Sequence, residues 1–190
     1  MAAKHEIGIK ILFSHSTNHY VRLYSVISYG ARKADESLGE IGYILHCPKC
    51  LHREVHSGMF LSGSEIKCRE CGSNLKFAGP LWVGKILDAE YCRKIGENLG
   101  KFEYLSREAK KVVSLVLCEV DAPISYYVVD KICGRMKLPT PPLNQVIEKI
   151  RSMGFKAVKT HFHSRGIKTD APSSIVFEAV KKAVENAENA

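Results

Sequence analysis

Two CxxC pairs carry the strongest chemical signal in this 190-residue chain. Cys47 and Cys50 form the first pair, and Cys68 and Cys71 form the second, with seventeen residues between the pairs. Each pair can present two thiolates to one ion, and two pairs complete a tetrahedral shell of four cysteines. Such a shell leaves no open position for a substrate or a water molecule. The spacing therefore predicts one structural zinc ion without a catalytic role.

Three alternatives to this zinc site remain open. The four thiols could be reduced and free of metal. A redox-active pair is disfavoured because neither CxxC opens a helix after a strand. A mixed shell is disfavoured by the irregular spacing of the three nearby histidines, which are His46, His52 and His56. Leu51 stands where such turns commonly carry glycine, so the backbone is expected to support Cys50 less well.

A second signal lies in residues 149–168, which contain six basic side chains and no acidic one. Lysines and arginines along one edge neutralise phosphates and release counterions. The stretch therefore favours nucleic-acid binding over an ordinary charged surface. The predicted RNA contacts are Lys149, Arg151, Lys156, Lys159, His161, Arg165 and Lys168, with Arg22 and Trp82 as secondary candidates.

His161 and His163 alternate on a predicted strand, so both side chains would lie on one face. A metal pair or acid–base catalysis is geometrically possible there. No Asp, Glu or Cys candidate stands nearby in the sequence. Base stacking or phosphate contact is therefore the preferred interpretation.

Composition agrees with a polyanionic partner, because the net charge is +8 and the isoelectric point is about 9.1. No apolar run approaches the roughly eighteen residues that cross a membrane. The N-terminus lacks the apolar core of a signal peptide, so a cytoplasmic protein without membrane association is expected. The three remaining cysteines are expected to be buried apolar groups, namely Cys92, Cys118 and Cys133.

The elements that would position these residues fall into three groups. Apolar and β-branched runs at 7–13 and 19–27 predict a hairpin, which is marginal in water without further strands. We therefore expect its sheet to be completed from elsewhere. A helix over 31–41, the cysteine module over 43–78 and a strand over 81–87 follow. Asp88 is expected to cap a helix over 89–99.

The last third has the pattern of a winged helix. Three helices are predicted over 107–119, 124–136 and 142–153, with Ser106 and Thr140 as caps. A strand over 155–161, a basic loop and a return strand over 167–169 would form the wing. A final helix is predicted over 173–184. The third helix would be the recognition helix.

No glycine-rich phosphate loop, nucleophile elbow or HExxH motif stands in the sequence. Two function classes remain. The chain could be the accessory half of an RNA-modifying enzyme. Alternatively, it could be a zinc-containing winged-helix regulator that binds DNA and has no enzymatic activity.

Three segments resemble the tRNA (guanine-26-N2)-dimethyltransferases of archaea and eukaryotes. They are FSHSTNHYVRLY (13–24), GPLWVG (79–84), and THF followed by GIKTDAP (160–162 and 166–172). They stand in the order of that family, with the two CxxC pairs in the expected place. Two positions depart from its pattern, because Asn18 replaces an expected Asp and Ile11 a usual Pro.

The resemblance implies an α+β chain in three parts. Residues 1–30 would be the last two strands of a Rossmann-like methyltransferase sheet. Residues 31–104 would hold a linker helix and a zinc ribbon-like module of four cysteines, and 105–190 a winged-helix-like tRNA-binding domain. The implied reaction transfers methyl groups from S-adenosylmethionine to a guanine amine of tRNA. No position matches the family's cofactor or catalytic motifs, so the chain alone is expected to be inactive and completed by a further segment or a separate subunit.

Overall fold

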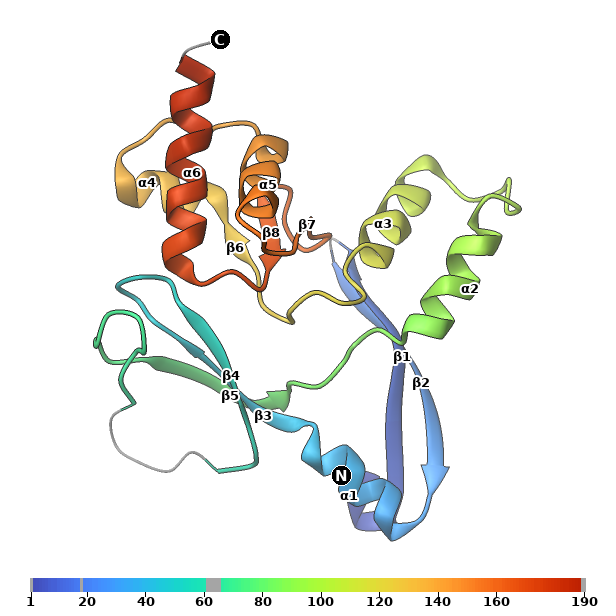
Figure 1. Ribbon diagram of the computed structural model, residues 1–190. Helices are drawn as coiled ribbons and strands as arrows, with labels where there is room; N and C mark the ends of the chain where they lie inside the picture. Colours follow the sequence, from blue (N-terminus) through green and yellow to red (C-terminus); the bar gives the residue numbers. More distant parts are fainter. Residues whose placement is uncertain (1, 18, 61–65, 189–190) are drawn as a thin grey trace. The chain divides into compact units, whose positions relative to one another are not determined.

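The computed structural model describes residues 2–17, 19–60 and 66–188 (Figure 1). Helices are combined with three small sheets, whose strand orders are β1-β2, β4-β3-β5 and β6-β8-β7. The expected α+β class is confirmed. The chain forms two compact units. We call residues up to His15 together with Tyr20–Cys92 the N-terminal unit, and Ser16–His19 together with Arg93 onward the C-terminal unit.

The N-terminal unit contains the hairpin, one full helix and a three-stranded sheet. Its elements are η1 (Ala2–His5), β1 (Ile7–Thr17, whose last two residues belong to the C-terminal unit), β2 (Tyr20–Tyr29), α1 (Ala31–Gly39), β3 (Ile41–His46), β4 (Arg53–Ser57) and β5 (Lys76–Trp82). The predicted hairpin and the helix after it are confirmed. Both strands of the hairpin are longer than the apolar runs that predicted them.

The two hairpin strands differ sharply in burial. Helix α1 packs against β1 so closely that a Cβ on Gly8 would lie 2.4 Å from the carbonyl oxygen of Lys33. Strand β2 is exposed along almost its whole length. Its apolar side chains include Val21 at 72% exposure, Ile27 at 60% and Tyr29 at 81%. One strand is therefore covered by this chain, and the other is not.

The cysteine pairs lie at one end of the second sheet, next to the paired residues His46, Arg53 and Lys76. Strand β3 pairs antiparallel with β4 and with β5, and it buries Tyr43 and Leu45. The sequence did not predict β3 or β4, and the strand expected over 81–87 ends at Trp82. Short strands between loops have weak periodicity, so their pairing decides where they begin and end.

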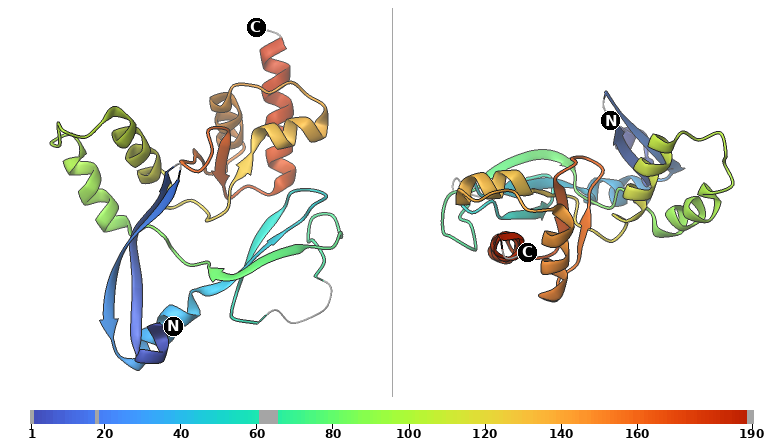
Figure 2. Two further views of the ribbon diagram at one scale, coloured as in Figure 1. Left: turned by 180° about the vertical axis from the view of Figure 1, so that it is seen from behind. Right: turned by 90° about the horizontal axis from the view of Figure 1, so that it is seen from above.

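In the C-terminal unit, helices α4, α5 and α6 lie around the third sheet (Figure 2). Helix α2 (Ala89–Leu99) spans the boundary, and the unit continues with α3 (Arg107–Leu117), β6 (Tyr127–Val128), α4 (Val129–Met136), α5 (Leu143–Ser152), β7 (Ala157–Lys159), β8 (Gly166–Thr169) and α6 (Ser173–Glu188). Helix α6 packs on α5 and α4, and the side chains between them are fully buried. Each buried valine or isoleucine contributes roughly 1.5–3 kcal/mol.

Predicted caps and boundaries had mixed outcomes. Ser106 caps α3, because its hydroxyl accepts from the amide of Ala109 at 3.1 Å. Asp88 likewise accepts from the amide of Tyr91 at 3.0 Å at the start of α2. The helix expected over 124–136 begins only at Val129, because Tyr127 and the residue after it pair with β8 instead. Helix α5 has no side-chain cap, so the cap expected at Thr140 is wrong.

In the part of the chain that the structure describes, none of the helices has both the length and the apolar character needed to cross a membrane.

Candidate metal centre and nucleic-acid interface

The four cysteines of the two CxxC pairs meet at one point, with all four Sγ atoms within 4.8 Å of one another. The Sγ atoms of Cys47 and Cys71 are 3.4 Å apart, and those of Cys50 and Cys68 are 3.5 Å apart. Four sulfurs at about 2.3 Å from one tetrahedral ion would be separated by about 3.8 Å. The cluster therefore needs only small adjustments to hold a single metal ion.

Both cysteine turns have the same backbone geometry. The amide of Leu51 donates to the carbonyl of Cys47 at 3.0 Å, and the amide of Gly72 donates to that of Cys68 at 2.9 Å. Leu51 has φ +63° and Gly72 has φ +69°, so both occupy the left-handed region. The amide of Cys50 also points toward the Sγ of Cys47, at 3.4 Å. Leu51 thus takes the conformation that glycine takes in the second turn.

The protein environment acts differently on the thiols. Hydrogen bonds from the side chain and backbone of Ser73 lower the pKa of Cys71 to about 6. Burial raises the pKa of Cys50 to about 12. A positive ion at the centre would stabilise all four thiolates at once, because metal ligation requires deprotonated sulfur.

Ion pairs join the two cysteine turns beside the sulfurs. The Nδ1 of His52 lies 2.7 Å from a carboxylate oxygen of Glu70, and the guanidinium of Arg69 lies 3.2 Å from Glu54. His52 therefore interacts with carboxylates of the module.

Of the lone cysteines, Cys92 and Cys133 are buried as expected, but Cys118 is exposed, so that prediction was wrong for Cys118.

The basic stretch does not form one uniform surface. The ammonium groups of Lys156 and Lys159 are on exposed residues, and Lys149 on α5 is half-buried. Arg151 is exposed, and its Nε donates to the carbonyl of Ala157 at 2.9 Å. Three lysines and one arginine thus remain accessible in this part of the C-terminal unit.

Two predicted phosphate contacts are buried. The side chains of His161 and Lys168 are each 1% exposed, and both contact the fully buried carboxylate of Glu119. Lys168 Nζ lies 2.8 Å from one oxygen, and His161 Nδ1 lies 2.7 Å from the other. In this conformation neither side chain can reach a phosphate. The interpretation that no acid stands near His161 was wrong, because Glu119 comes from 42 residues away.

The Glu119 carboxylate is stabilised in its charged form. Burial would raise the pKa of Glu119, but hydrogen bonds from His161 and Lys168 and the charge of Lys168 outweigh that effect. The pKa is consequently lowered from its ordinary value. The backbone amide of His161 donates a further bond at 2.6 Å. We refer to Glu119, His161 and Lys168 as the Glu119 cluster.

Sequence reasoning also overlooked Phe162. Its ring is 37% exposed and stacks on Tyr126, with centroids 5.9 Å apart and planes 5° from parallel. Arg165 is held nearby in the chain by Asp130 at 2.9 Å and by the carbonyl of Pro141 at 2.8 Å. Strand β7 ends at Lys159, so Phe162 lies in the bend after it and strand alternation does not indicate its exposure.

The secondary RNA candidates lie in the N-terminal unit. Arg22 is exposed on β2, and its guanidinium carbon lies 5.1 Å from the ring centroid of Tyr20. Trp82 ends β5, and its indole N–H donates to the carbonyl of Lys85 at 3.3 Å. The part of the hairpin loop at Asn18 lies outside the described residues.

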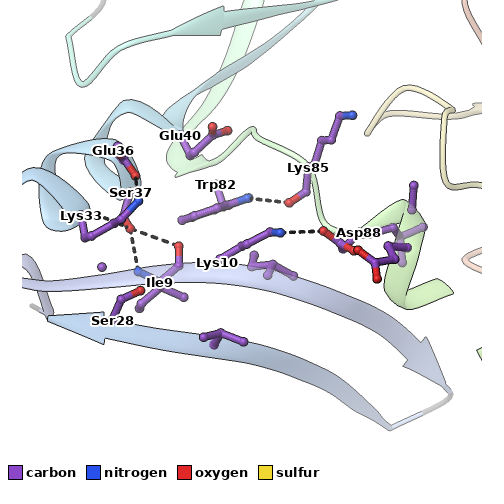
Figure 3. A pocket seen from close by; sticks show the side chains of 16 residues that line it. Ile9, Lys10, Ser28, Lys33, Glu36, Ser37, Glu40, Trp82, Lys85 and Asp88 are labelled. Carbon is purple, nitrogen blue, oxygen red and sulfur yellow. Dashed lines mark hydrogen bonds and ion pairs between the residues drawn. The ribbon is translucent and has the colours of Figure 1, made fainter. Parts of the chain in front are cut away.

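Trp82 lines a cavity of about 610 Å³ in the N-terminal unit (Figure 3). Lys10 points toward Asp88 across it, with Nζ 2.7 Å from the carboxylate. The ionisable lining consists of three lysines and four carboxylates: Lys10, Lys33, Lys85, Glu36, Glu40, Asp88 and Glu90. Because the carboxylates outnumber the lysines, the lining offers no excess of positive charge to a phosphate.

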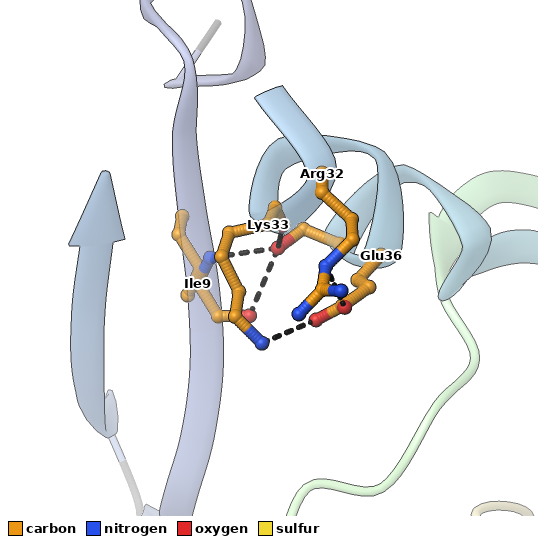
Figure 4. Close-up of polar contacts among 5 residues, drawn as sticks. Ile9, Arg32, Lys33 and Glu36 are labelled. Atoms are coloured by element: carbon orange, nitrogen blue, oxygen red, sulfur yellow. Dashed lines mark hydrogen bonds and ion pairs between the residues drawn. The ribbon is translucent and has the colours of Figure 1, made fainter. Parts of the chain in front are cut away.

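One wall of the cavity covers the outer edge of β1 (Figure 4). The hydroxyl of Ser37 accepts from the amide of Ile9 at 2.7 Å and lies 3.1 Å from its carbonyl oxygen. Lys33 pairs with Glu36 at 2.8 Å beside this contact. Further along, the amide of Asp88 donates to the carbonyl of Leu12 at 2.8 Å. These contacts occupy positions on β1 where another strand would have to pair.

Comparisons with known proteins agree with the segments identified in the sequence. The tRNA (guanine(26)-N(2))-dimethyltransferase of Methanobrevibacter smithii is 41% identical over 180 residues, covering 94% of this chain and 46% of the relative. The tRNA (guanine(26)-N(2)/guanine(27)-N(2))-dimethyltransferase of Aquifex aeolicus is 32% identical over 186 residues, covering 97% and 45%.

A solved structure shares the fold. It is the complex of Trm1 from Pyrococcus horikoshii with S-adenosyl-L-methionine, at a TM-score of 0.77 and 29% sequence identity. The likeness covers 94% of this chain and 45% of that one. The chain thus spans slightly less than half the length of the relatives it matches. A family model described as N2,N2-dimethylguanosine tRNA methyltransferase matches residues 1–181, and this chain belongs to that family.

Proposed function

We propose that this chain supplies the tRNA-binding part of an S-adenosylmethionine-dependent tRNA (guanine-26-N2)-dimethyltransferase. The match over residues 1–181 and the names of the relatives support the reaction class. The reaction would transfer one or two methyl groups to the exocyclic amine of a guanine. Reaching that amine requires the base to leave its stack.

The location of the cofactor site remains part of the proposal. The relatives match 94% of this chain, and the comparisons do not say where in those proteins S-adenosylmethionine binds. That it binds outside the described residues stays a prediction. The relatives carry the matched part and the rest of their length in one chain, which gives no support to a separate subunit.

The hairpin is proposed to form the end of a larger sheet. Contacts from Ser37 and Asp88 already occupy the outer edge of β1. Strand β2 is exposed, with Val21 and Ile27 more than half accessible. Additional strands would therefore pair with β2, leaving β1 as the outermost strand. The burial of about four large apolar side chains would stabilise this arrangement by several kcal/mol.

The observation that carries the RNA-binding proposal is the exposed side of β7 and the loop after it. Lys156 and Lys159 are exposed there, and the accessible ring of Phe162 follows them. Lysines contact phosphates, and an exposed aromatic ring can stack on a base. The order α3, β6, α4, α5, β7, β8 agrees with the proposed winged helix, in which α5 carries Lys149 and Arg151.

The four-cysteine cluster is proposed to hold structural zinc. Its four sulfurs fit the tetrahedral coordination that zinc takes with thiolates. The ion would join the two turns at one end of the β4-β3-β5 sheet. It would supply folding energy and no open coordination position for chemistry.

A charge-matched pair of variants tests RNA binding. Lys156→Ala/Lys159→Ala should weaken tRNA binding and reduce the steepness of its salt dependence, by about 0.7–0.9 in logarithmic slope for each lost phosphate contact. Lys181→Ala/Lys182→Ala removes the same charge from α6, where both lysines pair with glutamates. Equal effects of the two variants would show that only net charge matters.

A competition experiment decides whether the chain binds tRNA or duplex DNA in preference. Labelled tRNA should be displaced best by folded tRNA and poorly by random or genomic duplex DNA at physiological salt. The comparisons lend no support to the DNA-binding regulator. Displacement by one particular duplex at far lower concentration would nevertheless reverse the assignment.

A further inference from the structure

We infer that Glu119 and His161 are positioning residues that hold the end of β1 at Ser16 within the C-terminal unit. The described residues Ser16, Thr17 and His19, which we call the hairpin tip, would then form part of its RNA-facing surface. The anchoring contact is a hydrogen bond from the backbone amide of Ser16 to Nε2 of His161, at 3.1 Å. Ser16–His19 belongs to the C-terminal unit, although the rest of the hairpin belongs to the other unit. The RNA part of this inference rests on the proposed function.

The two ring nitrogens of His161 have different roles. Nε2 accepts from the Ser16 amide, so it carries a lone pair. Nδ1 lies 2.7 Å from the Glu119 carboxylate and must therefore carry the proton. A neutral imidazole protonated only at Nδ1 satisfies both contacts. A carboxylate partner selects this tautomer, as second partners commonly do for histidine.

The rest of the cluster balances the charge of Glu119. Lys168 provides the cation at 2.8 Å, and both side chains are at most 1% exposed. His161 can therefore stay neutral and keep Nε2 as an acceptor. Of the two ring nitrogens of His161, only Nδ1 donates a hydrogen bond to the ion pair between Lys168 and Glu119. The bond from the Ser16 amide to Nε2 is therefore a separate contact, which joins the cluster to the end of β1.

The anchor lies next to the proposed RNA contacts. Lys159 is exposed two residues before His161, and the accessible ring of Phe162 follows it directly. His19 in the anchored tip is exposed as well. All of these residues belong to the C-terminal unit. An RNA strand that contacts Lys159 and Phe162 would therefore run beside the tip.

Two substitutions separate the two contacts of His161. Asn places a side-chain amide near the position of Nδ1, and Gln places one near that of Nε2. His161→Asn should keep the Glu119 contact and lose the Ser16 bond. His161→Gln should do the opposite. Hydrogen exchange of the Ser16 amide should accelerate about three- to tenfold in His161→Asn, as expected for one lost hydrogen bond, and change less in His161→Gln.

A matched control and an independent signature accompany these variants. His163→Asn makes the same change two residues away, where Nδ1 accepts from the amide of Arg165 at 3.0 Å, and it should not alter exchange at the tip. Long-range nitrogen–proton spectra of the unaltered protein at pH 8 should show His161 protonated at Nδ1 only. Protonation at Nε2 in the unaltered protein would overturn the anchor even if a variant failed to fold. Equal exchange of the Ser16 amide in three folded variants would overturn it as well.

Binding of tRNA tests the second half of the inference. His161→Asn should weaken binding several-fold with an unchanged salt slope, because no phosphate contact is removed. Faster exchange at the tip with unchanged tRNA affinity would show that the tip is not part of the RNA surface. The proposed function would survive that result. It would fail separately if Lys156→Ala/Lys159→Ala had no effect on tRNA binding.

Discussion

The four-cysteine site and the Glu119 cluster both gather groups that are costly to bury alone, but they assemble them over different distances along the chain. In the four-cysteine site each turn brings two ligands together locally, and only one further contact between turns is needed. The Glu119 cluster combines residues from the end of α3, from the segment after β7 and from β8, and it then contacts Ser16.

This difference predicts different responses to substitution. The cysteine turns keep their local hydrogen bonds without a metal, and the ion pairs between the turns are weaker than the coordination bonds that a metal ion would add. The Glu119 cluster has no exchangeable centre, and its members satisfy one another. Losing the ion should therefore unfold one module, whereas losing Glu119 or Lys168 should leave the other as a buried charge without a partner.

The largest effect is expected from breaking the metal shell. Cys47→Ser should abolish zinc binding and unfold the β4-β3-β5 sheet, because the apparent binding energy of structural zinc is roughly 10–16 kcal/mol. Metal content and circular dichroism on purified protein measure both consequences. Cys118→Ser, at an exposed cysteine outside the cluster, should change neither. A folded Cys47→Ser variant without metal would show that zinc is not required for the fold.

Removing the partner of the buried Lys168 should lower the free energy of unfolding by less than losing the metal does. Glu119→Gln leaves Lys168 as an unpaired cation at 1% exposure, and we expect a loss of about 3–5 kcal/mol. Native-state hydrogen exchange of α5 and α6 amides measures the free energy of unfolding of the C-terminal unit. Glu178→Gln is the control, since its pair with Lys182 is 48% exposed on both sides and should contribute less than about 1 kcal/mol. Equal losses in both variants would contradict a buried ion pair.

In acid, the unaltered protein and Glu119→Gln should have the same free energy of unfolding. The pKa of Glu119 is lowered below its ordinary value of 4.5, so the stabilisation by its carboxylate is fully present above that value. It is lost as the pH falls through the lower pKa of the folded state. Unfolding free energies of the two proteins should therefore differ by a constant amount between about pH 5 and 8 and converge in stronger acid. Convergence near about pH 6 would point to a different titrating group.

The smallest effect concerns the backbone of the second cysteine turn. Gly72 has φ +69°, and a Cβ there would meet nothing within 4 Å, so Gly72→Ala adds only backbone strain. A loss of about 1–2 kcal/mol is expected for the zinc-loaded module, seen as a lower melting temperature. Gly134→Ala in α4, also with open space around it, should be neutral or slightly stabilising. A neutral Gly72→Ala would mean that the turn relaxes.

The same contrast explains which features could be predicted from the sequence. The metal ligands stand three residues apart within each turn, and the caps Ser106 and Asp88 stand beside the helices they begin. Local spacing of this kind follows from the chain alone. The start of α4 could not be predicted, because Tyr127 leaves a helical pattern to pair with β8 about forty residues later.

The basic stretch, residues 149–168, shows most clearly what could not be predicted from the sequence. A list of charges could not distinguish Lys159, which is exposed, from Lys168, which is buried. The distinction depends on Glu119, whose approach requires the end of α3 and β8 to pack together. Phe162 was overlooked for a similar reason, since its exposure and its stacking on Tyr126 depend on a bend after β7 that was predicted as part of the strand.

By itself, the sequence determined the CxxC pairs, the hairpin, the caps at Ser106 and Asp88 and the family resemblance, because these depend on spacing over a few residues or on motif order. Tertiary structure decided which cations face solvent, that Leu51 takes the left-handed conformation of Gly72, and that His161 contacts Ser16. Burial of a charge depends on partners that are distant in the sequence. Only packing brings those partners within hydrogen-bonding distance.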